Sequence, residues 1–128
     1  MRYLRTEEIL AIHDRIVEET GGIFGVRDLN ALEYVAHRPQ TSIGGTEMFP
    51  GVFRKATAYL EAIATGHPFS DGNKRTALTT ASVFLSLNGY MIDLSDVSEA
   101  EEFMVRAAQK LVPPEDIASW LEKHCTKK

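Results

Sequence analysis

Apolar residues recur every three to four positions along most of this chain, and glycine or proline interrupts the pattern at intervals. The first such stretch carries Ile9, Ile12 and Ile16 on one side and ends at two glycines. This spacing is typical of an amphipathic α-helix, and glycine favours the end of a helix. Strand-like segments do not alternate with these helices, which argues against a Rossmann-type sheet. The pattern therefore predicts an all-α fold.

The predicted helices share this spacing but differ in length. They run from Thr6 to Thr20, from Asp28 to before Pro39, from about Pro50 to Thr65, from Asn73 to about Asn88, from Asp96 or Ser98 to before Pro113, and through Ile117 to Leu121. We expect Thr6 to cap the first helix and Pro50 to lie in the first turn of the third. Because Ala77 and Ala81 permit close packing, we expect the fourth helix to be central. Residues 90–94 are expected to be extended.

The segment from Gln40 to Glu47 contains two adjacent glycines and is expected to form an exposed loop. Such a loop either only connects two helices or forms a flap over a site. The sequence slightly favours the connecting role.

Length and composition limit the kind of protein. A chain of 128 residues suits one domain, here 1–128, and 44% hydrophobic residues are ordinary for a globular protein. The net charge of −4 argues against nucleic acid as a direct ligand. Cys125 is the single cysteine, which excludes an intramolecular disulfide. No signal peptide or membrane span is visible, so we expect a cytoplasmic protein.

The start of the fourth predicted helix has the properties of an anion site. The first N–H groups of a helix have no internal partners, and together with the helix dipole they attract phosphate. Gly72 allows close approach of the anion, and Asn73 continues the same turn. Lys74 and Arg75 add two positive charges beside it. These four residues are predicted to bind a nucleotide phosphate.

Asp71 precedes this turn and offers a carboxylate to a metal ion. Mg²⁺ commonly binds one or two carboxylates together with substrate phosphates. We therefore predict that Asp71 holds Mg²⁺ with ATP. The alternative is that Asp71 only caps the helix.

His67 lies between Gly66 and Pro68, outside the helical pattern and close to the phosphate turn. A histidine there can take a hydroxyl proton near neutral pH, so His67 is the candidate general base. Phe69 is expected to turn inward and anchor the loop. The remaining histidines, His13, His37 and His124, stand isolated in helical segments and are interpreted as structural.

Two further features of the sequence predict no catalytic or binding role. The glycine-rich segment 21–25 lacks a P-loop ending and is interpreted as a turn. Arg27 is interpreted as a surface charge or a capping group.

The residues around His67 resemble the signature of the Fic/Doc family. The wider Fic group has His-Pro-Phe-x-Asp/Glu-Gly-Asn-Gly-Arg-x-x-Arg, and this chain has His67-Pro68-Phe69-Ser70-Asp71-Gly72-Asn73-Lys74-Arg75-Thr76-Ala77-Leu78. Further stretches look like the death-on-curing (Doc) branch; they are Tyr3-Leu4, Ile9 to Asp14, Gly25 to Leu29, Arg38 to Gln40 and Leu87 to Tyr90. The resemblance covers most of the chain and implies an all-α fold.

Two departures from the wider pattern bear on the reaction. Lys74 replaces a glycine and Leu78 replaces the second arginine, as in the Doc branch. The resemblance thus implies a toxin of a toxin–antitoxin system that transfers the γ-phosphate of ATP to a hydroxyl of a target protein, a translation factor. His67 would then be the base, Asp71 the magnesium ligand, and residues 72–75 the phosphate site.

The resemblance also implies a small antitoxin that inhibits the toxin in trans. No convincing inhibitory motif lies within the chain: Thr57 to Glu61 comes closest but is followed by Ala62. Nucleotidyl (AMP) transfer of the Fic type and a non-catalytic nucleotide- or protein-binding module remain as alternatives. A metal-dependent nuclease ranks below them, because one His and one Asp are few ligands for a metal.

Overall fold

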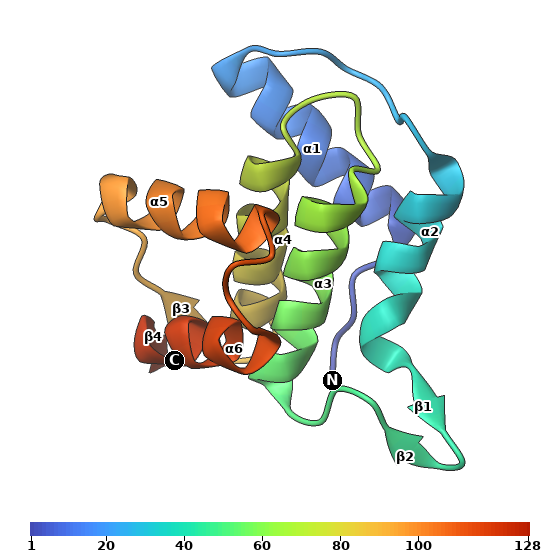
Figure 1. The fold of residues 1–128 in the computed structure, drawn as a ribbon, viewed down its shortest axis with the longest axis vertical. Helices are drawn as coiled ribbons and strands as arrows, with labels where there is room; N and C mark the ends of the chain where they lie inside the picture. Colours follow the sequence, from blue (N-terminus) through green and yellow to red (C-terminus); the bar gives the residue numbers. More distant parts are fainter.

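The computed structural model describes residues 1–128 and consists mainly of helices (Figure 1). The elements in chain order are α1 (Thr6–Thr20), α2 (Leu29–His37), the 3₁₀-helix η1 (Arg38–Gln40), β1 (Ser42–Ile43), β2 (Thr46–Glu47), α3 (Val52–Gly66), α4 (Asn73–Leu87), β3 (Tyr90–Ile92), α5 (Val97–Ala108), α6 (Pro114–Lys123) and β4 (Cys125–Lys127). The mostly helical fold predicted from the sequence is confirmed. None of the helices is long and apolar enough to cross a lipid bilayer.

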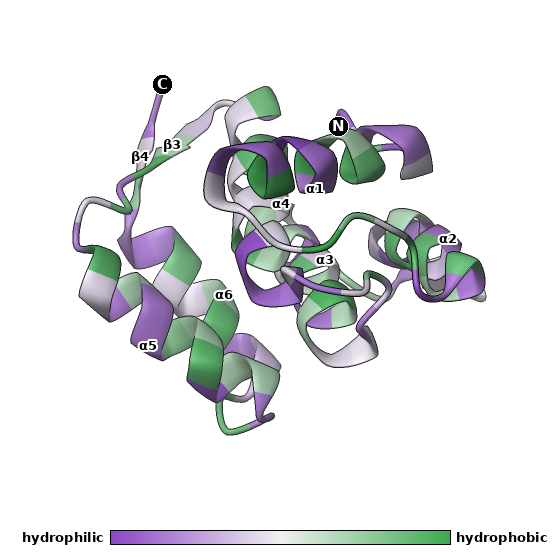
Figure 2. Ribbon diagram, turned by 90° about the horizontal axis from the view of Figure 1, so that it is seen from above, coloured by the Kyte–Doolittle hydropathy of each residue, from purple (hydrophilic) through white to green (hydrophobic).

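Helices α3 and α4 lie side by side at the centre, and the other helices surround them (Figures 1 and 2). On α4, Ala77 and Ala81 are fully buried, as are Phe84 and Leu85. Small side chains let two helix backbones approach closely, so the prediction that this helix is central is confirmed. Further core side chains come from α1, α2, α3, α5 and α6; they include Ile9, Leu32, Val35, Tyr59, Leu60, Ile63, Phe103, Met104, Ile117 and Leu121.

Helix α1 has the bounds that its apolar stripe predicts, but its cap differs from the prediction. Thr6 is already helical, and Arg5 is the N-cap residue. The carboxylate of Glu8 accepts a hydrogen bond of 3.0 Å from the Arg5 backbone N–H. A carboxylate from the first turn therefore satisfies the cap in place of the Thr6 hydroxyl.

The expected loop at 40–47 contains a small antiparallel hairpin of β1 and β2. Ser42 pairs with Glu47 and Ile43 with Thr46. Both residues of the intervening turn, Gly44 and Gly45, have positive φ, which favours a two-residue hairpin turn. The segment is exposed as predicted, but it forms a hairpin where the sequence predicted only a loop.

The hairpin is held at the first turn of α3. Lys55 is 2% exposed, and its Nζ donates to Glu47 Oε1 at 2.9 Å and to the Phe49 carbonyl at 2.6 Å. The helix itself begins at Val52 after Gly51, which has a φ of 86°, so Pro50 lies outside it, contrary to the prediction. At 1.5 Å per residue, the twelve residues from Lys55 to His67 span about 18 Å. The hairpin therefore lies at the end of α3 remote from His67 (Figure 1), which favours a structural role over a flap that covers the site.

The C-terminal tail forms a strand that the sequence analysis did not predict. β4 pairs antiparallel with β3, joining Tyr90 to Lys127 and Ile92 to Cys125. Residues 90–92 are extended as expected. This pairing joins segments far apart in the chain, and it secures the tail beside α4.

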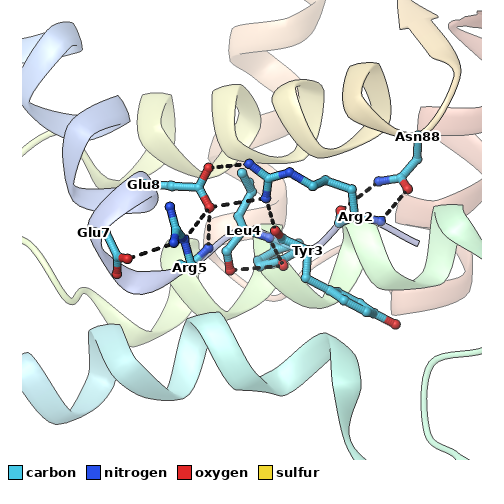
Figure 3. A network of polar contacts seen from close by, with 8 residues as sticks. Arg2, Tyr3, Leu4, Arg5, Glu7, Glu8 and Asn88 are labelled. Carbon is cyan, nitrogen blue, oxygen red and sulfur yellow. Dashed lines mark hydrogen bonds and ion pairs between the residues drawn. The ribbon is translucent and has the colours of Figure 1, made fainter.

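The N-terminal segment is fastened to the central helices by a polar network (Figure 3). The Leu4 N–H donates to the Tyr59 hydroxyl at 2.9 Å, and burial raises the pKa of Tyr59 to about 12. Arg2 pairs with Glu8 at 2.7 Å, and its backbone N–H donates to Asn88 at 2.8 Å. The network joins the start of α1 to α3 and to the end of α4.

Glu8 should make stability depend on acid pH. Hydrogen bonds from Arg2 and from the Arg5 backbone lower the pKa of Glu8 to about 2. The pKa of an unfolded glutamate is about 4.3. Because the folded value is lower, the contribution of Glu8 is fully present above the unfolded pKa and is lost as pH falls through the folded one. We predict that Glu8→Gln lowers the urea midpoint at pH 7 and that its difference from wild type shrinks between pH 5 and pH 2.

Glu7→Gln is the matched control, because Glu7 pairs with Arg5 while both side chains are mostly exposed. It should leave the midpoint unchanged at every pH. If the urea midpoints of Glu8→Gln and wild type differed by the same amount across this pH range, the lowered pKa of Glu8 would not be the source of the difference.

Candidate active site

His67 marks the end of α3 and the start of the loop that leads to α4. It is the C-cap residue, with φ 48° and ψ 57°, and its side chain is exposed. A left-handed conformation is uncommon for residues other than glycine, and it occurs mainly where a helix ends, as here. Both ring nitrogens lack a hydrogen-bond partner within the chain. The imidazole is therefore free to exchange a proton with a bound molecule.

Arg27 holds the backbone on which His67 sits. Its Nε donates to the His67 carbonyl at 2.7 Å, and a terminal nitrogen donates to the Gly66 carbonyl at 3.2 Å. The last carbonyls of a helix have no partners within the helix, so a cation at this end is favourable. Arg27 thus caps α3, one of the two possibilities left open by the sequence.

The loop before α2 runs along the motif loop and pairs with it (Figure 1). The Arg27 and Asp28 N–H groups both donate to the Pro68 carbonyl, at 2.8 and 3.1 Å. The Ser70 N–H donates to the Gly25 carbonyl at 3.1 Å. The glycine-rich segment interpreted as a turn is therefore one side of the site. Sequence reasoning missed this, although residues 25–29 were among the stretches that resemble the family.

Phe69 anchors the loop in the core, as predicted, and is 1% exposed. The side chain of Asn73, in the first turn of α4, bonds to both backbone polar groups of Phe69. Its side-chain oxygen accepts from the Phe69 N–H at 3.1 Å, and its amide nitrogen donates to the Phe69 carbonyl at 3.0 Å. Both polar atoms of the Asn73 side chain therefore hold the backbone of Phe69, and the Asn73 backbone N–H remains without an acceptor in the chain.

The first turn of α4 presents unpaired donors. Gly72 is the N-cap with a φ of 74°, and no side chain caps the helix. The N–H groups of Asn73, Lys74 and Arg75 have no acceptor in the chain, whereas Thr76 already bonds to the Gly72 carbonyl. The side chains of Lys74 and Arg75 are exposed and form no ion pair with any carboxylate. We call this turn, residues 72–75, the phosphate cradle; its donors and charges suit an anion.

Asp71 lies at the edge of the phosphate cradle but does not cap α4. Its Oδ1 accepts from the Gly72 N–H at 2.8 Å and its Oδ2 from the Ile23 N–H at 3.3 Å. Gly22 has a φ of 119°, which favours glycine, and a Cβ there would lie 2.9 Å from Oδ2 and so would displace this carboxylate. The two bonds orient an exposed carboxylate while each oxygen keeps a free lone pair.

The surroundings of Asp71 fit a magnesium ion that is shared with a nucleotide. No group of three or more His, Cys, Asp or Glu side chains in the chain could enclose a metal. A single carboxylate suits Mg²⁺, which takes its remaining ligands from phosphates and water.

An apolar groove opens beside the phosphate cradle, between α1, α4 and α5. Its volume is about 480 Å³, and Lys74 and Arg75 lie on its rim. Leu78, at the position of the second family arginine, lines it together with Val97 and Met104. This position therefore contributes apolar surface and no charge to the site.

His13 is not isolated, contrary to the sequence interpretation. It is fully buried under the motif loop, and its Nε2 lies 2.8 Å from the Asp71 carbonyl oxygen. A histidine on an amphipathic helix gives no local signal for such a contact. The other two histidines lie away from the motif: His37 is exposed in the last turn of α2, and His124 contacts Trp120 and Glu99.

Arg27→Ala should loosen the paired loops. Removing both bonds to α3 is expected to lower the free energy of unfolding by about 1 kcal/mol. It should also speed hydrogen exchange of the Ser70 and Asp28 amides, which join the two loops. Arg54→Ala is the control, because Arg54 is exposed on α3 and bonds to nothing; its effect should stay within about 0.5 kcal/mol. If these two amides exchanged at the wild-type rate in Arg27→Ala, the bonds from Arg27 to the end of α3 would not be what holds the motif loop.

Comparison with known proteins agrees with this arrangement. A sequence profile described as the Fic/DOC family matches residues 3–85, which include the motif loop and nearly all of α4. "Protein kinase doc" of Escherichia phage P1 is 34% identical over 123 residues, which cover 96% of this chain and 95% of that protein. "Toxin Doc" of Mycolicibacterium smegmatis is 37% identical over 102 residues, 79% of this chain and 78% of the relative. The chain belongs to the Fic/DOC family.

Proposed function

We propose that this chain is a Doc-type toxin that transfers the γ-phosphate of ATP to a hydroxyl group of a target protein. The observation that carries the proposal is the phosphate cradle, with three unpaired N–H groups and two cations that have no carboxylate partner. An exposed histidine lies at the other end of the same short loop. The relatives named protein kinase doc and Toxin Doc support the same chemistry and the toxin–antitoxin setting.

The reaction follows from these groups. The backbone donors of the phosphate cradle, with Lys74 and Arg75, bind the phosphates and neutralise charge that develops during transfer. The target hydroxyl oxygen forms a bond to the γ-phosphorus as the bond to the β–γ bridging oxygen breaks, and ADP leaves. His67 accepts the hydroxyl proton. Mg²⁺, held by Asp71 and the phosphates, supplies further charge neutralisation when it is bound.

Leu78 favours γ-phosphate transfer over AMP transfer. In the wider Fic pattern an arginine at this position binds a phosphate, whereas leucine offers no donor. Here Leu78 is part of the apolar groove. The chain therefore lacks the cation that the Fic pattern has at this position, and Lys74 supplies one where that pattern has glycine.

The proposed partners are a translation factor as target and a small antitoxin that inhibits in trans. The resemblance to the Doc branch supports both, and the name of the second relative supports the toxin class. For the antitoxin we propose the apolar groove, because Val97 and Val105 on its rim are 60% and 43% exposed. An apolar face of a helix laid there would cover Lys74 and Arg75, and so would block the phosphate cradle.

The proposed reaction can be tested by labelling. The protein is incubated with Mg²⁺ and a bacterial extract in the presence of ATP labelled at either the γ- or the α-phosphate. We expect one labelled protein with γ-labelled ATP and none with α-labelled ATP; mass spectrometry of that band identifies the target. Label from the α-phosphate alone would favour AMP transfer, and ATP binding without any label would favour a non-catalytic module.

His67→Ala is the decisive variant in this assay. Loss of a general base should reduce the rate by at least about 100-fold, while the melting temperature stays unchanged because the His67 side chain is exposed. His37→Ala is the matched control, since His37 is also exposed but lies in α2. Equal labelling by His67→Ala and the wild type would exclude His67 as the base.

The groove proposal has a separate test. A genomic library of the source organism is selected for inserts that restore growth to cells producing the toxin. Replacing Val97 and Val105 by glutamate should abolish this rescue without reducing labelling, because both residues lie on the groove rim. Leu111→Glu, at a 60% exposed position outside the groove, is the control and should keep the rescue. Full rescue of the double variant would exclude this groove as the antitoxin site.

A further inference from the structure

His13 is a polar residue in the core, and its one hydrogen bond reaches the active site. The side chain is fully buried on the inner face of α1. Its Nε2 lies 2.8 Å from the Asp71 carbonyl oxygen. A carbonyl oxygen can only accept a hydrogen bond, so Nε2 must carry a proton in this contact.

The ring orientation is set by Phe69. The two rings stack in parallel, with centroids 3.9 Å apart and an angle of 4° between their planes. A Cβ at Gly72 would lie 3.8 Å from Nε2, so the histidine lies next to the N-cap of α4. His13 thus contacts the motif loop at Phe69 and at the carbonyl of Asp71, and it lies beside the start of the phosphate cradle.

Packing alone does not account for a histidine at this position. The second ring nitrogen, Nδ1, is buried and has no hydrogen-bond partner. The carboxylate oxygen Oδ1 of Asp14 lies 3.6 Å from Nδ1, and the two form an ion pair only when the ring is protonated. A buried polar group with half of its bonds unmade costs free energy, and an apolar ring of similar shape would avoid that cost. The bond to Asp71 is therefore what distinguishes His13 from a phenylalanine.

We propose that His13 is a positioning residue for nucleotide binding, an inference that rests on the proposed function. Its bond fixes the peptide between Asp71 and Gly72. That peptide carries the metal-binding carboxylate on one side and begins the phosphate cradle on the other. Without the bond, the carboxylate and the free N–H groups lose their common alignment. Affinity for Mg²⁺–ATP then falls, although the fold persists.

The protonation of the ring can be measured on the unaltered protein without nucleotide. We expect the ¹⁵N shifts of the His13 imidazole to report a protonated Nε2, and the attached hydrogen to exchange slowly with water. A neutral ring protonated only at Nδ1 would overturn the proposal, because Nε2 could not then donate to Asp71.

Two variants separate positioning from packing. His13→Phe keeps a ring to stack on Phe69 but has no donor, whereas His13→Gln keeps an N–H donor at about the position of Nε2 but has no ring. We expect His13→Phe to bind Mg²⁺–ATP about tenfold more weakly than wild type, and His13→Gln to stay within about threefold, as measured by calorimetry. A purely structural histidine predicts the reverse order, with His13→Phe the better binder and the more stable protein, and that result would overturn the proposal.

The proposed function and this inference can fail separately. Binding of Mg²⁺–ATP by wild type without transfer would refute the kinase activity and leave the comparison of the variants intact. If wild type bound no nucleotide, the positioning role would be tested by the NMR chemical shifts of the Gly72 to Arg75 amides without nucleotide. Relative to wild type, these shifts should change in His13→Phe and stay nearly the same in His13→Gln. The absence of a change in His13→Phe would overturn the positioning role.

Discussion

The pairing of two loops by their backbones is the constraint on which the site depends. The segment before α2 donates to Pro68 and accepts from Ser70, and Asn73 binds both backbone groups of Phe69. A buried or crowded loop needs such partners for its N–H and C=O groups. These bonds hold the two loops together, and the first three N–H groups of α4 are left without an acceptor in the chain. The candidate anion site therefore depends on the loop that leads into α4.

Local charge, and not the net charge of the protein, governs what this site attracts. The chain carries a net charge of −4, yet Lys74 and Arg75 have no carboxylate partner. Some cations elsewhere lie in ion pairs, as Arg2 does with Glu8 and Arg38 with Glu61. Leaving two cations free beside a helix N-terminus concentrates positive potential at one place. This distribution suits a small phosphorylated ligand better than a nucleic acid backbone.

Local pattern was sufficient to predict the helices and to single out the motif loop, and insufficient to predict which contacts hold that loop in place. The bounds of α1 and the inward turn of Phe69 follow from periodicity and from one apolar residue in a polar loop. The β4 strand could not be predicted, because three residues gain strand geometry only by pairing with β3. The contacts of His13 and Arg27 join residues 39 or more positions apart, and a single sequence carries no signal for them. The binding roles of residues 71–75 and the catalytic role of His67 stay predictions.

The central claim is that the start of α4 binds the phosphates of a nucleotide. Titration of the ¹⁵N-labelled protein with Mg²⁺–ATP, followed by amide chemical shifts, tests it most directly. We predict that the N–H groups of Asn73, Lys74 and Arg75 show the largest shifts, saturate together, and barely respond to adenosine. Saturable shifts confined to another surface, with these three amides unchanged, would contradict the claim.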